Sequence, residues 1–313
     1  MHASEPPRSF GPMQSLDPEI QPVMDVFPVL ALSPETLPLM RGALGPQGEL
    51  SDRVERTEHL VGDVPVRVHR PAGVEGPLPC IFSIHGGGYV LGSYAMDDAT
   101  FDQWCPTLGV VGVSVEYRLS PETAYPGPLE DCYAALKWAY DEASSLGIDR
   151  SKIGVRGVSA GGGLTAGLAL LARDRGEVPV AFQLLDCPMI DDRGTNPSIQ
   201  HDGLPVWTRE ANTFGWQSYL GDLYGTDDVP YTAAPARAED LSGLPPAFVS
   251  VGSVDGFHDE DVTYALRLNQ AGVPTELHVY PGAGHAYQAA IGSRIARQSA
   301  RDQLEWLKVQ LAR

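Results

Sequence analysis

The chain has 313 residues, of which 43% are hydrophobic and 20% charged, as in an ordinary globular protein. Its formal net charge of −18 disfavours nucleic acids and anionic membrane surfaces as partners. The sequence holds no run of about 20 apolar residues that could span a membrane, and its first residues lack the basic and apolar regions of a signal peptide. We therefore expect a cytoplasmic protein.

The four cysteines, Cys80, Cys105, Cys132 and Cys187, do not have the spacing of a metal-binding or redox motif. They stand in apolar or helical runs, which favours buried, reduced thiols. The H-E-x-x-H motif of zinc hydrolases is absent from the sequence. We expect neither a metal nor another cofactor.

The first 50 residues are rich in proline and contain two short helical candidates, Asp17–Val26 and Pro34–Gly42. From Val64 onward, short β-rich runs alternate with helical ones. The run Val64–Arg70 alternates apolar and polar residues, which predicts a strand at an exposed edge. The later β-rich runs are Pro79–His85, Val110–Tyr117, Lys152–Val158, Val180–Asp186, Ala247–Asp255 and Thr275–Tyr280, and most of them favour strands buried on both faces.

Helical patterns lie between several of these strands, at Pro128–Leu146, Ala160–Arg173, Asp259–Ala271 and Ile291–Leu311. This alternation predicts an α/β fold with a mostly parallel sheet covered by helices on both faces. The segment Asp191–Asp240 interrupts it with about fifty residues that contain several aromatics and no sheet strand. An inserted helical lid is a better interpretation of that segment than a bare loop, and the N-terminus could pack beside it.

Two kinds of chemistry fit the glycine-rich stretch around Ser159. Gly157–Gly161 has the pattern G-x-S-x-G, in which the serine is a nucleophile on a sharp turn from strand to helix. The overlapping stretch Gly161–Ala166 has the pattern G-x-G-x-x-A of a dinucleotide-binding turn, and Asp186 follows at the spacing of a ribose-binding acid. The expected strand runs directly into Ser159, however, so the first glycine of a dinucleotide turn would already lie inside the helix.

A second motif favours the nucleophile. His85–Gly88 reads HGGG at the end of an earlier strand, where bare backbone N–H groups could stabilise the oxyanion of an acyl-transfer reaction. The N–H of Ala160, directly after the nucleophile, would complete such an oxyanion hole. The two motifs together are more specific than either alone.

A serine nucleophile also needs a histidine base and an acid that orients it, in the chain order Ser, acid, His. Four histidines follow Ser159: His201, His258, His278 and His285. We expect His285 to be the base, because it follows a strand on a glycine-rich loop. His201 lies in the insertion, His258 comes too soon after the candidate acid, and His278 lies within an alternating strand.

The expected acid is Asp255, at the end of the strand that precedes His285. A turn aspartate without a catalytic role is the alternative at this position. Asp259 and Glu260 are better placed to cap the following helix, whose N-terminus favours acids.

From about Val64 to the C-terminus, the chain resembles the hormone-sensitive-lipase-like branch of the α/β-hydrolases, the bacterial family IV esterases. The resemblance rests on HGGG (His85–Gly88), YRLSPETAYP (Tyr117–Pro126) followed by LED (Leu129–Asp131), GVSAGG (Gly157–Gly162), DGFHDE (Asp255–Glu260) and His285. It implies an α/β-hydrolase fold and a serine carboxylesterase that hydrolyses small, short-acyl esters through an acyl-serine intermediate. It further implies Ser159, Asp255 and His285 as the catalytic triad, with an oxyanion hole formed by Gly87, Gly88 and Ala160.

The same resemblance implies a cap formed by residues 1–50 and an insertion at about 191–240, on a catalytic domain of residues 51–313. Arg118 and Glu122 would form a structural ion pair or bracket a turn. The chain departs from the usual family motifs at Val158, at Gly256-Phe257 and at Ala286-Tyr287, which affects the expected substrate preference rather than catalysis.

Two other functions compete with the esterase. A non-catalytic small-molecule receptor on the same fold, as in the plant gibberellin receptors, would lack the catalytic histidine, whereas His285 is present. A nicotinamide-dependent oxidoreductase would leave the HGGG motif unexplained. The sequence does not decide between a monomer and a homodimer.

Overall fold

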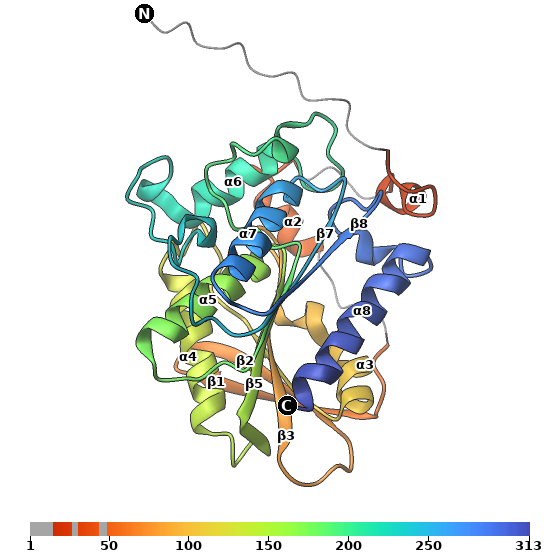
Figure 1. Ribbon diagram of the computed structural model, residues 1–313, viewed down its shortest axis with the longest axis vertical. Helices are drawn as coiled ribbons and strands as arrows, with labels where there is room; N and C mark the ends of the chain where they lie inside the picture. The colour runs from red at the N-terminus through yellow and green to blue at the C-terminus, as the bar shows by residue number, and fades with distance from the viewer. Residues whose placement is uncertain (1–14, 27–30, 44–48) are drawn as a thin grey trace, which may run out of the picture.

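A central sheet of eight strands organises the molecule (Figure 1), a computed structural model that describes residues 15–26, 31–43 and 49–313. The order across the sheet is β1-β2-β4-β3-β5-β6-β7-β8. The strands are β1 Val54–Val61, β2 Val64–Pro71, β3 Leu78–Ile84, β4 Val111–Val115, β5 Ile148–Val158, β6 Gln183–Asp186, β7 Ala247–Gly252 and β8 Thr275–Tyr280. The pairs β1–β2 and β2–β4 are antiparallel and the other pairs are parallel. The predicted mostly parallel sheet is confirmed.

Helices cover both faces of the sheet (Figure 1). They are α1 Gln21–Met24, α2 Leu37–Ala43, α3 Asp98–Leu108, α4 Gly127–Asp141, α5 Ala160–Arg175, α6 Arg209–Leu220, α7 His258–Gln270 and α8 Arg294–Leu311. Apolar residues of α3 and α8 pack on one face, and those of α4, α5 and α7 pack on the other. In the described part of the chain, no helix is both long and apolar enough to cross a membrane.

The antiparallel edge of the sheet differs from the sequence-based prediction. The strand expected at an exposed edge is β2, but β1 lies outside it and β2 is paired on both sides. Strand β1 escaped prediction because only Val54 of its eight residues is buried, so it has no apolar face with a recognisable period. Helix α3 was also missed, although its buried Phe101, Trp104 and Cys105 have helical spacing, because Pro106 interrupts the pattern.

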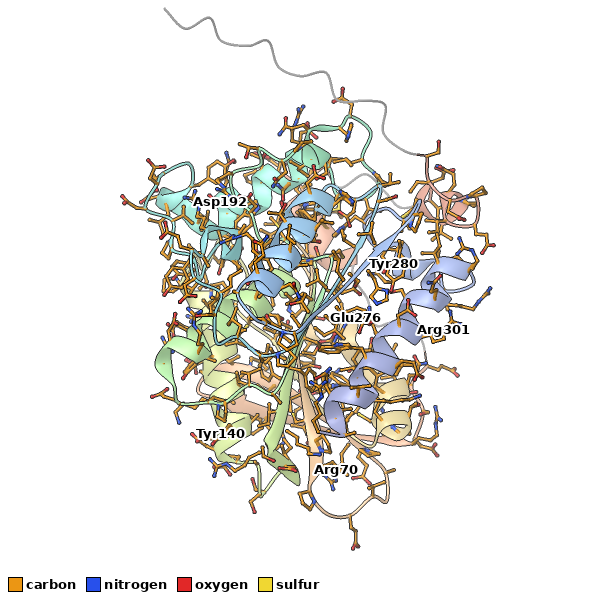
Figure 2. All side chains as sticks on the ribbon, viewed as in Figure 1. Arg70, Tyr140, Asp192, Glu276, Tyr280 and Arg301 are labelled. Carbon is orange, nitrogen blue, oxygen red and sulfur yellow. The ribbon has the colours of Figure 1, made fainter. Side chains whose placement is uncertain are left out.

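Residues 191–240 contain α6 and three short 3₁₀ turns and contribute no strand to the sheet. In Figure 1, α6 lies with α1 and α2 at one end of the molecule. The Tyr219 ring of α6 stacks on Tyr89, with 4.1 Å between ring centroids. At the other side of the segment, Arg237 Nε donates to Asp192 Oδ1 at 2.7 Å (Figure 2 labels Asp192). The first contact holds α6 against the loop that follows β3, and the second joins the two ends of the segment.

Candidate active site

Ser159 forms the whole turn between β5 and α5. Its φ of 57° and ψ of −123° are unusual for a residue with a side chain, which is the kind of backbone strain found at functional sites. A Cβ at Gly157 would collide with the carbonyl oxygen of Gly161, and a Cβ at Gly161 would collide with that of Ile84. The two glycines therefore allow the sharp turn and the close approach of β3.

The structure leaves no room for the alternative, a dinucleotide-binding turn at these glycines. The stretch Gly161–Ala166 lies entirely inside α5, where a Cβ at Gly163 would collide with a neighbouring backbone segment. Asp186 is buried at the end of β6 and accepts hydrogen bonds from Ser250 Oγ at 2.8 Å and Gln303 Nε2 at 3.0 Å. No pyrophosphate can approach those glycines, and Asp186 is engaged by other side chains.

Ser159, His285 and Asp255 lie in a line of hydrogen bonds. Ser159 Oγ is 3.0 Å from His285 Nε2, and His285 Nδ1 is 2.8 Å from Asp255 Oδ2. The other carboxylate oxygen, Asp255 Oδ1, accepts the backbone N–H of Phe257 at 3.0 Å. The Phe257 ring also packs against the imidazole edge-on, with 5.1 Å between centroids. All three polar side chains are buried.

Two of the other downstream histidines pair with acids outside this line. His258 Nδ1 is 2.8 Å from Asp259 Oδ1 at the start of α7, and His278 Nε2 is 2.7 Å from Glu276 Oε1 on β8. The acids in the first turn of α7 also differ from the prediction, because they do not cap the helix.

Glu260 does not cap its own helix. It is buried, and its Oε1 accepts the backbone N–H groups of Ile190 and Asp191 at 2.9 and 3.1 Å. Asp259 accepts the N–H of Ser198 at 2.9 Å instead. Both acids are drawn away from the N-terminus of α7 because the segment after β6 presents unpaired backbone donors to them. Burial raises the pKa of Glu260 well above its usual range, and the nearby carboxyl groups of Asp191 and Asp255 add to this shift.

The loop of residues 85–92, named the oxyanion loop after its expected role, follows β3, and its Gly86 lies next to Ser159. Gly87 and Gly88 both have positive φ, 117° and 60°, a region that favours glycine. Within the described residues, the N–H groups of these two glycines donate to no protein acceptor. The N–H of Ala160, the first residue of α5, likewise has no intrahelical acceptor because it lies at the helix start. In the described part of the chain, these three backbone N–H groups are therefore available to a ligand.

His85 orders this loop from inside the protein. Its Nδ1 is 2.8 Å from the Gly86 carbonyl oxygen, and its ring stacks on Tyr117 with 4.3 Å between centroids. Burial lowers the pKa of His85, so the neutral ring donates to Gly86 through Nδ1.

A single tetrapeptide of the insertion, the covering segment Leu-Pro-Val-Trp at residues 204–207, contacts three loops of the site. A Cβ at Gly284, next to His285, would lie 2.6 Å from Pro205 Cγ, and a Cβ at Gly88 would collide with the Trp207 indole. A Cβ at Gly256, next to Asp255, would lie 2.6 Å from Ile199 Cδ1 and 3.1 Å from Leu204 Cδ1. Gly88 and Gly284 therefore make room for residues of the covering segment, and Gly256 makes room for Ile199 and Leu204 together.

The covering segment is itself strained. Trp207 N–H donates to the Pro205 carbonyl oxygen at 2.7 Å, and Val206 between them has a φ of 64°. This is a γ-turn with a positive φ, which is rare, and for a β-branched residue such a φ is an outlier. The turn holds the Trp207 ring 6.4 Å from the His285 ring, between centroids.

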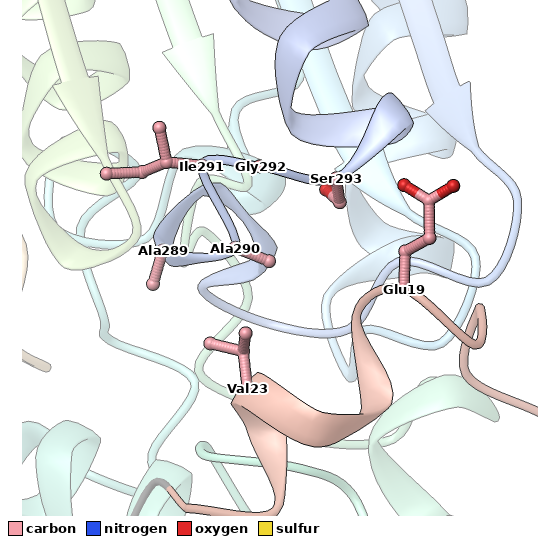
Figure 3. Close-up of a pocket in the computed structure, with 7 residues that line it drawn as sticks. All are labelled: Glu19, Val23, Ala289, Ala290, Ile291, Gly292 and Ser293. Atoms are coloured by element: carbon pink, nitrogen blue, oxygen red, sulfur yellow. The ribbon is translucent and has the colours of Figure 1, made fainter.

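The two N-terminal helices hold the loops of the site from outside. The N–H of Asp17, just before α1, donates to the carbonyl oxygen of Gly282 at 2.9 Å, three residues before His285. Beside this contact, an open pocket of about 620 Å³ lies between Glu19 and Val23 of the α1 region and residues 289–293 (Figure 3). Its lining includes none of the residues of the hydrogen-bonded line.

Helix α2 holds the oxyanion loop through Arg41. Its Nε donates to the Val90 carbonyl oxygen and its Nη2 to that of Ser120, both at 2.8 Å, and its guanidinium pairs with Glu122 at 2.8 Å. Of the two expectations for Arg118 and Glu122, an ion pair or the bracketing of a turn, the ion pair is therefore wrong.

Arg118 pairs with Asp131 on α4 instead, with Nη2 and Oδ1 2.7 Å apart. Asp131 is buried, and it also accepts the Arg118 N–H at 3.0 Å. The acid of the LED motif was therefore available as a signal, but a partner in a separate helix cannot be deduced from spacing alone.

Four cysteines are free and buried, as the sequence predicted. Cys187 lies next to Asp255 and His285, a position that no sequence motif indicated. Its Sγ, an Asp255 oxygen and a His285 nitrogen all lie within 4.8 Å of one another.

Comparisons with known proteins identify the family of this chain. A family model described as alpha/beta hydrolase fold matches residues 81–289. Carboxylesterase NlhH of Mycobacterium tuberculosis is 36% identical over 283 residues, covering 87% of this chain and 88% of that protein. Ethyl acetate hydrolase of Pseudomonas putida is 33% identical over 227 residues, covering 72% of this chain and 71% of that protein. A solved structure named bacterial heroin esterase superimposes with a TM-score of 0.89 at 40% identity, covering 95% of this chain and 98% of that one.

Proposed function

We propose that this chain is a serine esterase that uses Ser159, Asp255 and His285 and that prefers small esters with short acyl chains. The chain belongs to the family with the alpha/beta hydrolase fold, in its hormone-sensitive-lipase-like branch, and is a carboxylic ester hydrolase. The observation that carries this proposal is the continuous line from Ser159 Oγ through both nitrogens of His285 to Asp255, at 3.0 and 2.8 Å. The order and contacts of these groups match the roles of nucleophile, base and orienting acid.

In the proposed reaction, Ser159 Oγ attacks the ester carbonyl carbon while His285 Nε2 takes its proton. Asp255 keeps the other proton on Nδ1 and stabilises the imidazolium. The oxyanion is stabilised by the N–H groups of Gly87, Gly88 and Ala160, which act where the negative charge develops. His285 then protonates the leaving alkoxide, and the C–O bond breaks to leave an acyl-serine. Water, deprotonated by His285, attacks that ester, and the acid and free Ser159 are released.

The test combines substitution with active-site labelling. We expect Ser159→Ala to lower kcat for p-nitrophenyl acetate by at least about 10⁴-fold, because the nucleophile is removed from a triad that acts as a unit. A serine-directed organophosphate should label the parent protein once, and mass spectrometry should locate the label at Ser159. The buried Ser114→Ala, on β4, is the matched control and should keep both hydrolysis and labelling.

Labelling at another residue, or a Ser159→Ala protein that keeps its rate, would refute the assignment. A parent protein that binds esters but hydrolyses none would favour the alternative of a receptor.

The proposed preference for short acyl chains rests on the small space above the nucleophile. Ser159 and His285 are each only 6% exposed, and the Trp207 indole fills the space over Gly88. A substrate carbonyl that reaches the proposed oxyanion donors must fit beside this ring. Because one methylene group is worth about 1–3 kcal/mol of discrimination in a tight apolar pocket, the ring would disfavour longer acyl chains.

Shortening Trp207 tests this size limit. We expect Trp207→Ala to raise the ratio of kcat/KM for p-nitrophenyl octanoate over acetate by at least about tenfold, equivalent to about 1.4 kcal/mol. The control is Trp138→Ala, on the distant helix α4, which should leave the ratio unchanged. An unchanged ratio in a Trp207→Ala protein with normal thermal stability would show that another residue sets the limit.

A further inference from the structure

We propose that Cys187, Asp255 and His285 form a binding site for a thiophilic divalent cation, Zn²⁺ or Cd²⁺, and that the bound cation switches the esterase off. The three side chains offer one sulfur, one oxygen and one nitrogen, all within 4.8 Å of one another. All three are buried, and Cys187 is fully so. The cation would be an inhibitor rather than a cofactor, because it would replace the proton that joins His285 to Asp255.

The fold brings the thiol to this place through the turn after β6. Cys187 directly follows β6 and has a φ of 42°, and its N–H donates to the Ser250 carbonyl oxygen at 2.6 Å. The backbone carbonyl oxygen of the preceding residue, Asp186, accepts the N–H of Ser159 at 2.9 Å. The nucleophile turn and the cysteine are thus held together by consecutive backbone positions, so the distance between the thiol and the triad is a fixed property of the sheet.

Thiolate, imidazole and carboxylate are the ligands that zinc prefers in proteins. With Zn–S of about 2.3 Å and Zn–N or Zn–O of about 2.0–2.2 Å, two ligands of one tetrahedral ion lie about 3.2–3.7 Å apart. The three donors lie within 4.8 Å of one another, and the His285 and Asp255 donors are 2.8 Å apart. To hold a tetrahedral ion, the thiol would have to move closer by about 1 Å and the His285 and Asp255 donors would have to separate by about 0.5 Å, and water would supply the fourth position.

The surroundings of the three donors are acidic. Four buried acids gather here, Asp186, Asp255, Glu260 and Asp261. None of the ion pairs in the described part of the chain joins any of them to a lysine or an arginine. Both carboxyl oxygens of Asp261 are without a hydrogen-bond partner. Burial raises the pKa of Asp261 and Glu260, so these two acids keep their protons in the absence of a cation; a bound cation would supply the positive charge that no lysine or arginine provides, and would allow them to ionise.

Inhibition follows from the tautomer of His285. The catalytic base must carry its proton on Nδ1 and keep a lone pair on Nε2, facing Ser159. A cation on Nδ1 requires the opposite tautomer: the Nδ1 proton moves to Nε2, and the Cys187 thiol releases its proton to solvent. Nε2 then has no lone pair to accept the Ser159 proton. This inference rests on the proposed function, since it needs His285 to be the base.

Activity measurements with the metal alone give the first test. We expect Zn²⁺ to inhibit hydrolysis of p-nitrophenyl acetate, and EDTA to restore it. Cys187→Ala should keep hydrolysis but raise the Zn²⁺ concentration for half-inhibition by at least about tenfold, because one of three protein ligands is lost. Cys132→Ala, which removes an equally buried thiol on α4, is the matched control and should be inhibited like the parent. Equal inhibition of the Cys187→Ala protein and the parent would overturn the proposal.

Binding can also be measured without any activity. Cd²⁺ added to Ser159→Ala should produce the ultraviolet charge-transfer band of a cadmium thiolate, because the serine is not a ligand. The band should be absent from Ser159→Ala/Cys187→Ala and present in Ser159→Ala/Cys132→Ala. If Ser159→Ala abolishes hydrolysis but shows no band, the proposed function stands and the metal site is refuted. Should Cys187→Ala fail to fold, Cys187→Ser with the same two measurements replaces it.

Discussion

Asp261 is a carboxyl group that the fold buries completely without giving it a partner. It lies in the first turn of α7, and neither of its oxygens accepts or donates a hydrogen bond. Burial, together with the carboxyls of Glu260, Asp255 and Asp186, raises the pKa of Asp261 well above its usual range. The folded protein therefore keeps a proton that the unfolded chain releases above about pH 4. The stability of the fold falls as the pH rises from that value toward the raised pKa.

We expect Asp261→Asn to remove this dependence. Relative to the parent, the free energy of unfolding of the variant should increase with pH, by up to about 1.4 kcal/mol for each unit above about pH 4. Urea unfolding of both proteins at pH 5 and pH 8 measures the difference.

The control for this experiment is Asp240→Asn. That carboxyl is exposed, and a hydrogen bond from Ser242 lowers its pKa, so its replacement should bring no gain with rising pH. A parent and an Asp261→Asn protein that change in parallel between the two pH values would show that Asp261 is ionised in the fold.

At the scale of single residues, the sequence indicated which residues could react better than it indicated which residues surround them. Ser159, Asp255 and His285 were predicted from motifs, strand ends and chain order, and the structure brings all three into contact. Cys187 and Asp261 could not be found in this way. Their surroundings are made by β6, β7 and α7, which meet only in three dimensions, and neither residue belongs to a local pattern.

Among the elements, α2 shows how a short helix can affect a distant reaction. Arg41 of this helix donates hydrogen bonds to two backbone carbonyl oxygens in or near the oxyanion loop, those of Val90 and Ser120. We expect Arg41→Met to lower kcat by about tenfold with little change in KM. A hydrogen bond from a charged group is worth about 1.5–3 kcal/mol, and its loss would loosen the loop that carries the proposed oxyanion donors.

Steady-state kinetics separates kcat from KM in this variant, and a thermal melt checks that the fold is retained. Arg301→Met, on the exposed side of α8, is the matched control and should leave both constants unchanged. If Arg41→Met changes only KM, the helix acts on substrate binding and not on the oxyanion loop.

The helices and strands also differ in how well the sequence predicts them. Central strands and the helices α4, α5, α7 and α8 were predicted to within a few residues, because continuous apolar runs and helical periods persist over their length. Strand β1 and helix α3 were missed. A strand with one solvated face and polar residues on the other has no period to detect, and its place outside β2 depends on tertiary pairing.

For the whole molecule, the net charge of −18 is the dominant electrostatic property. Mutual repulsion of surface acids destabilises the compact state, and salt screens it. We expect the Tm to rise by a few degrees, about 1 kcal/mol, between 0 and about 0.5 M NaCl at neutral pH. Differential scanning calorimetry measures this change.

A charge-reduced variant provides the comparison for that experiment. Neutralising the four exposed acids Asp52, Glu75, Asp222 and Asp228 to Asn or Gln changes the net charge from −18 to −14. The variant should respond less to NaCl than the parent does. A Tm that is constant or falls with salt would show that attractive ion pairs outweigh the repulsion.

The covering segment has a consequence for how this protein could be recombined with its relatives. Pro205 and Trp207 occupy space left by glycines in two other loops, at positions 284 and 88, and Leu204 lies against a third glycine, at position 256. A donor protein with a larger residue at position 88 or 284 would clash with the segment, and a bulkier segment would clash with these glycines. The covering segment of a chimera therefore cannot be exchanged as a separate module: it must travel with two positions that lie almost two hundred residues apart in the chain.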